Sequence, residues 1–70
     1  MNLPELFSMR QMYLIELEKA KSLRDMTQHI LSRSDLSKEL TTELNTLSKR
    51  YCGDIEHYSI KLHQLETHSN

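Results

Sequence analysis

One short stretch, SRSDLS at residues 32–37, interrupts a helical pattern that otherwise runs through this chain. Its hydroxyl and carboxylate side chains compete for backbone groups, so they favour helix caps over helix interiors. We therefore predict helices over about residues 3–31 and 38–65, a loop over about 32–37 and a frayed tail at 66–70. A loop this short makes the helices antiparallel neighbours. The predicted fold is all-α, a single αα-hairpin domain spanning residues 1–70.

The residues around the expected helix starts support these boundaries. Asn2 and Glu5 have the spacing of a capping box, and Pro4 is tolerated in a first turn. Asp35 or Ser37 is the favoured cap of the second helix, with Ser34 as a third candidate. Composition agrees, because the chain has twelve Leu, no Val, one Gly and one Pro, which disfavours strands and turns.

Apolar residues recur every three or four positions in both expected helices, which places them along one side of each. We predict that the two sets face each other as the intramolecular core. In the first helix the set is Leu6, Met9, Tyr13, Leu17, Ala20, Leu23, Thr27 and Ile30, with Leu31 beside it. In the second helix it is Leu40, Leu44, Leu47, Tyr51, Ile55, Tyr58, Leu62 and Leu65. Gly53 and Ile60 lie on the opposite side of the second helix, where a second contact patch stays an open alternative.

The first half of the first helix carries more apolar residues than one interface can cover. Leu3, Phe7 and Leu14, here called the outer stripe, fall on a different face, and Ile15 flanks its far side. A two-helix hairpin buries one side of each helix, so we predict that these four residues bind a partner chain. A second copy forming a four-helix bundle and a different helical protein both satisfy the pattern. The short length of the stripe favours a different protein.

Charge and cysteine content narrow the function classes. Nine basic and ten acidic residues give a net charge of −1, so no overall field attracts nucleic acid. The single cysteine, Cys52, has no internal disulfide partner; it flanks the apolar set and is expected to be partly buried. No signal peptide and no apolar run of about 20 residues is present, so we expect a cytoplasmic protein without a membrane span.

Residues that could carry chemistry are scattered. The histidines and Cys52 lack the spacing of metal ligands, and no Gly-rich phosphate loop is present. A two-helix hairpin also offers no concave pocket that would exclude water from acid or base groups. We therefore expect no metal, no cofactor and no enzymatic activity. The four histidines are His29, His57, His63 and His68.

A polar stripe on the first helix, with three basic residues, supports an alternative function. The layout resembles that of a small plasmid-encoded hairpin protein that dimerises into a four-helix bundle and binds RNA, so a homodimeric RNA-binding regulator is the alternative. The stripe lacks interleaved aromatic residues for base stacking, and acidic residues balance the basic ones, which favours a solvated face instead. Its members are Arg10, Lys21, Arg24 and Gln28.

Length, hairpin layout and a Leu-rich, Val-poor composition over the whole chain are also similar to another family. This family is the small co-chaperones of type III secretion needle subunits. The resemblance implies that the hairpin pairs with a larger helical-repeat chaperone, and that the two together keep a needle subunit from polymerising in the cytosol. It rests on no motif, so it assigns no individual residues. The expected function is a small adaptor or co-chaperone that shields an apolar helix of its partner.

Overall fold

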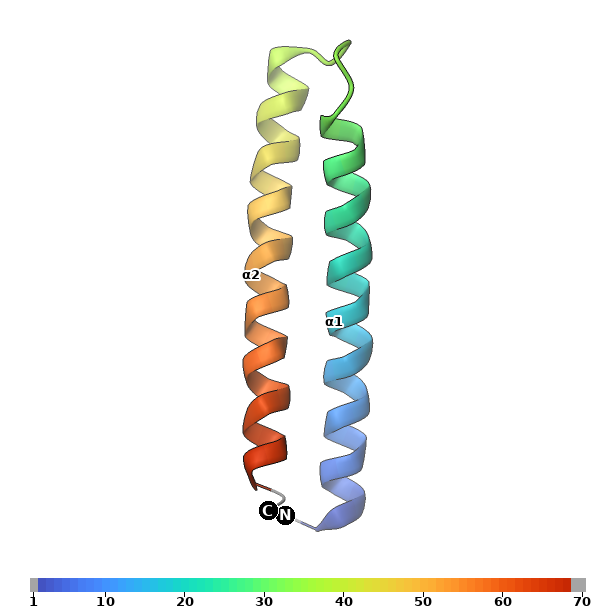
Figure 1. Ribbon diagram of the computed structural model, residues 1–70, viewed down its shortest axis with the longest axis vertical. Coiled ribbons are helices and arrows are strands. Elements are labelled where there is room, and N and C mark those ends of the chain that lie inside the picture. Colours follow the sequence, from blue (N-terminus) through green and yellow to red (C-terminus); the bar gives the residue numbers. More distant parts are fainter. Residues whose placement is uncertain (1, 69–70) are drawn as a thin grey trace.

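The structure, a computed structural model, describes residues 2–68 and contains two helices among them. Helix α1 spans Leu3–Leu31 and helix α2 spans Lys38–His68. The helices run antiparallel along their whole length, so α1 begins at the end of the molecule where α2 finishes (Figure 1). The Cα trace measures 52 × 13 × 13 Å. The predicted all-α hairpin is confirmed.

Helix α1 begins at the predicted cap. The Glu5 backbone N–H donates to the Asn2 side-chain Oδ1 at 2.9 Å, and the Leu6 N–H donates to the Asn2 carbonyl at 3.1 Å. Pro4 sits in the first turn, where its missing N–H costs no helical hydrogen bond. At the other end, the Ser32 N–H and hydroxyl both donate to the His29 carbonyl, which satisfies an acceptor that the helix leaves open.

The loop shows which of the candidate caps begins α2. The Ser37 Oγ accepts a hydrogen bond from the Leu40 N–H at 3.1 Å, so Ser37 is the cap. Asp35 instead pairs with Arg33, whose Nη2 lies 2.8 Å from Asp35 Oδ2. Helix α2 continues three residues past its predicted end, to His68. The last two residues of the predicted frayed tail, 69 and 70, lie outside the described residues.

Three neighbouring pairs fix the register of the two helices. Leu6 and Leu65 line the same depression at the open end of the hairpin. The Tyr13 and Tyr58 rings lie with their centroids 6.1 Å apart, tilted by 37°. Near the middle of the hairpin, Ala20 and Tyr51 line a common hollow. Side chains from the two predicted apolar sets therefore meet across the hairpin.

The core is a thin line along this contact. Leu17, Ala20 and Leu44 are the buried apolar residues among those described, and no described side chain is completely buried. Thr27 is the buried polar residue, and its hydroxyl donates to the Leu23 carbonyl at 2.7 Å. That bond removes the cost of burying an unpaired hydroxyl.

Every threonine of the chain repeats the bond made by Thr27. Each hydroxyl donates to the backbone carbonyl four residues earlier in its own chain, at distances from 2.7 to 3.1 Å. Such bonds are the usual alternative to solvation for threonines in or beside helices. The donors are Thr27, Thr41, Thr42, Thr46 and Thr67.

The predicted apolar sets are wrong at Ile30 of α1, which is 36% exposed, and at two positions of α2. Leu40 and Leu47 lie at the edge of the contact, 41% and 36% exposed. The neighbouring polar residues Thr41 and Ser48 are half-buried and take the inner positions. Counting back from Tyr51 in steps of three, four and three residues gives Ser48, Leu44 and Thr41. The inner side of α2 therefore includes two small polar residues beside the buried leucine.

Candidate protein-binding surfaces

Apolar side chains gather at the open end of the hairpin. Leu3 is 77% exposed and Phe7 is 63% exposed, and the two lie one turn apart on the same side of α1. With half-buried Leu6 and Leu65 they line a shallow depression, which Arg10 and Glu66 also line. We call Leu3, Leu6, Phe7 and Leu65 the terminal patch. It combines side chains from both helices into one mainly apolar surface.

The structure brings together two of the four predicted partner-binding residues. Leu3 and Phe7 share the depression, whereas Leu14 and Ile15 lie outside it. Leu14 is half-buried, and Ile15 is exposed.

Sequence analysis assigned Leu65 only to the intramolecular core and so missed its place beside Phe7. The antiparallel register was the available signal, because it puts the last turns of α2 beside the first turns of α1.

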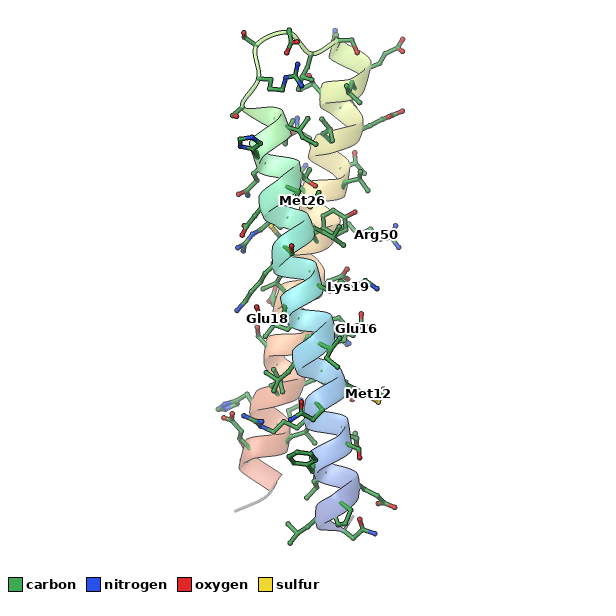
Figure 2. The ribbon with its side chains drawn as sticks, turned by 90° about the vertical axis from the view of Figure 1, so that its right-hand side faces the viewer. Met12, Glu16, Glu18, Lys19, Met26 and Arg50 are labelled. Atoms are coloured by element: carbon green, nitrogen blue, oxygen red, sulfur yellow. The ribbon has the colours of Figure 1, made fainter. Side chains whose placement is uncertain are left out.

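A second surface, at the middle of the hairpin, carries charges of alternating sign. Glu16 and Lys19 of α1 line one hollow together with Asp54 of α2. Figure 2 shows Glu16, Lys19 and Met12 pointing to one side of α1, with Arg50 of α2 on the same side and Glu18 on the other. We call the side with Glu16, Lys19, Arg50 and Asp54 the charged side.

The charges of the charged side lack partners within the hairpin. Among the described residues, ion pairs join Glu18 to Lys21 at 3.6 Å, Arg24 to Asp25 at 3.1 Å, and Arg33 to Asp35. None of the four residues of the charged side makes an ion pair with another described residue. Glu16 and Asp54 are moreover half-buried, so both lie close to the surface between the two helices.

The imidazole and thiol groups stay apart. Cys52 is exposed, so its predicted partial burial is wrong, and His29 and His63 are exposed too. The His57 ring packs edge-on against the Tyr58 ring, with centroids 5.0 Å apart. Within the described part of the chain, no three His, Cys, Asp or Glu side chains are placed to hold a metal ion. His68 belongs to α2, and its side chain lies outside the described residues.

Between residues 2 and 68, neither helix has an apolar segment long enough to cross a membrane. No protein-family model, curated protein or solved structure matches this chain.

Proposed function

We propose that this hairpin is a non-enzymatic interaction module that binds an apolar helix of another protein through its terminal patch. The observation that carries the proposal is the exposure of Leu3 and Phe7 beside Leu6 and Leu65 in one depression. Covering a side chain such as that of Phe7 stabilises a complex by roughly 2 kcal/mol. Exposed apolar side chains that cluster in this way are typical of interaction sites.

A helix is the partner element that fits this surface best. The depression receives side chains from two antiparallel helices, and a third helix packs into such a surface with apolar residues at spacings of three and four. The thin core of the hairpin supports the same reading, because a partner helix would add the apolar burial that two helices alone do not supply.

The role that fits these features is a small cytoplasmic adaptor or co-chaperone. It shields an apolar helix of its partner from water and from other copies of that partner. The resemblance in size and layout to type III secretion co-chaperones supports this role. Shielding needs an accessible apolar patch and no catalytic group. The partner then buries its apolar residues against the terminal patch instead of self-associating.

The test compares Phe7→Glu with Ile60→Glu. Both replace an exposed apolar side chain of similar accessibility, but Ile60 does not line the terminal patch. Proteins captured from a lysate of the source organism by the immobilised wild type are identified, purified and titrated against each variant by calorimetry.

We expect Phe7→Glu to weaken binding by at least about tenfold, because complex formation would bury an unpaired carboxylate. Ile60→Glu should bind like the wild type. Equal affinity of both variants, with equal helicity by circular dichroism, would place the binding site elsewhere.

The alternative, a homodimeric RNA-binding regulator, draws less support from the polar stripe of α1. Lys21 pairs with Glu18 and Arg24 pairs with Asp25, which weakens the positive field that the phosphate backbone requires. Salt-sensitive RNA binding by the purified protein alone, lost on replacing Arg10 and Arg24, would favour this alternative over the adaptor.

A further inference from the structure

We infer that two copies of this chain associate antiparallel through their charged sides, each copy supplying the counter-charges that the other lacks. The occupant of this surface is thus a second copy, whereas the terminal patch takes a different protein. The inference is independent of the adaptor proposal, since the terminal patch contains none of the residues used here.

The position of the charges defines where a two-fold axis would pass. Helix α1 has its midpoint at Leu17, between Glu16 and Lys19, and helix α2 has its midpoint at Gly53, between Arg50 and Asp54. A two-fold axis that crosses both helices at their midpoints places the second copy on the charged side. Its α1 then packs antiparallel on α1 of the first copy, and its α2 packs antiparallel on α2. Lys19 then lies within one residue of the position opposite Glu16 of the second copy, and Arg50 lies within two residues of the position opposite Asp54. These offsets, about 1.5 and 3 Å along the helix axis, are short enough for the long basic side chains to span. Symmetry forms each of these contacts twice.

A second Glu–Lys pair in α1 provides an internal comparison. Glu18 and Lys21 have the same spacing of three residues as Glu16 and Lys19, and they close an ion pair within the helix at 3.6 Å. Glu16 and Lys19 do not, although helical spacing permits it. The two charges of the central pair instead remain available for a second chain.

The dimensions of the hairpin favour a centred axis. One face of the hairpin, with Cα extents of 52 Å by 13 Å, has a projected area of roughly 700 Å². A standard protein–protein interface buries about 800 Å² on each partner, which is close to this area. Only a second copy that overlaps the full length covers that much. An antiparallel copy with its axis at the helix midpoints has this overlap, and a shifted copy has less.

Apolar residues beside the charges support the same arrangement. Met12 is exposed on the charged side, and half-buried Leu23 lines the hollow with Glu16 and Lys19. The centred axis puts Met12 of one copy opposite Leu23 of the other, again twice. The flexible methionine side chain adapts to such a surface, so each charged contact acquires an apolar neighbour that excludes water.

The test measures the dimer dissociation constant by sedimentation equilibrium for charge-reversed variants of the full chain. Wild type should dimerise. Glu16→Lys alone and Lys19→Glu alone each bring like charges together twice, so each should raise the dissociation constant by at least about tenfold. The double variant restores opposite charges across the axis and should return within about threefold of wild type.

The matched control is Glu18→Lys, the same substitution two residues away on the other side of α1. It breaks the internal pair with Lys21 and should leave the dissociation constant within about threefold of wild type. Phe7→Glu should also leave the dimer intact. A monomeric wild type, an equal loss with Glu18→Lys, or failure of the double variant to recover would overturn the proposal.

A second measurement applies even where a reversed charge unfolds the hairpin. In a Cys52→Ser background, one chain carries Met12→Cys and another carries Leu23→Cys, and the two are mixed under mild oxidation. The antiparallel axis predicts the mixed disulfide well above the twofold excess over each same-site disulfide that random pairing of equal amounts gives. Absence of that excess would overturn the proposed arrangement.

Discussion

The half of the hairpin near the loop and the half near the chain ends solve the packing of two helices differently. Near the loop, small side chains including Ala20, Thr27 and Ser48 share the inner positions with large ones such as Leu44. Toward the ends they hold large ones, including Tyr13 and Tyr58. The well-buried residues all lie at the middle or in the loop half: Leu17, Ala20, Thr27 and Leu44.

This difference shows that a large apolar side chain does not secure burial in a two-helix structure. The two helices bury the small side chains of Ala20 and Thr27, whereas the tyrosine pair of the terminal half stays half-buried. The terminal half therefore keeps apolar surface that only another molecule can cover, and it is also the half that carries the terminal patch. If the terminal patch binds a partner as proposed, stability and binding are drawn from different halves of one hairpin.

The largest expected effect tests the burial of the loop half. Leu44→Ala should destabilise the hairpin by about 2–4 kcal/mol, because it leaves a cavity at a buried position. Leu47→Ala, one turn away at the exposed edge, should cost about 1 kcal/mol. Urea denaturation followed by circular dichroism measures both. Equal losses would contradict the assignment of inner and edge positions in α2.

A smaller effect separates the two ends of the hairpin. Ser37→Ala and Asn2→Ala each remove one capping hydrogen bond, which costs about 1 kcal/mol of helix stability. The loss at Ser37 should lower the protection of amide hydrogens throughout α2, since this cap adjoins the better-packed half. The loss at Asn2 should be confined to the first turns of α1. Hydrogen exchange measured residue by residue distinguishes the two patterns, and whole-chain loss in both variants would contradict the contrast between halves.

The smallest expected effect is stabilising and falls at the boundary between the halves. A Cβ added at Gly53 meets nothing within 4 Å, so Gly53→Ala should raise stability by about 0.5–1 kcal/mol through its higher helix propensity. Thermal denaturation measures the gain. If the variant is more stable but loses binding to another chain, a further backbone contacts α2 at this glycine.

The sequence was sufficient to predict elements whose signals are local. The Asn2 cap and the break between the helices follow from side chains that bond to nearby backbone groups, whereas the second cap was narrowed only to Asp35 or Ser37 until the structure identified Ser37. The rotation of α2 about its axis was predictable only in part. Hydrophobicity favours Leu47 over its neighbour Ser48 as the inner residue. The rotation of α2 about its axis is instead set by all the inner contacts together, and it places Leu47 at the edge.

The candidate surfaces show the same limit. The apolar periodicity placed Leu3 and Phe7 away from the intramolecular contact, because the face on which a residue lies depends on its own helix alone. The contribution of Leu65 depends on the register between helices, so one helix considered by itself does not reveal it. The charged side escaped the sequence analysis for a related reason, since its four charges become neighbours only when both helix midpoints lie side by side.

The threonine hydroxyls, all bonded to carbonyls of their own chain, change how water meets the hairpin. With its oxygen turned back toward the main chain, each of these side chains offers mainly its methyl group to whatever lies beside it. The mean hydropathy of −0.63 counts them as polar, and so understates how much hydrocarbon the loop half presents. Toward a neighbouring helix, Thr41 acts much as a valine would, in a chain that contains no valine.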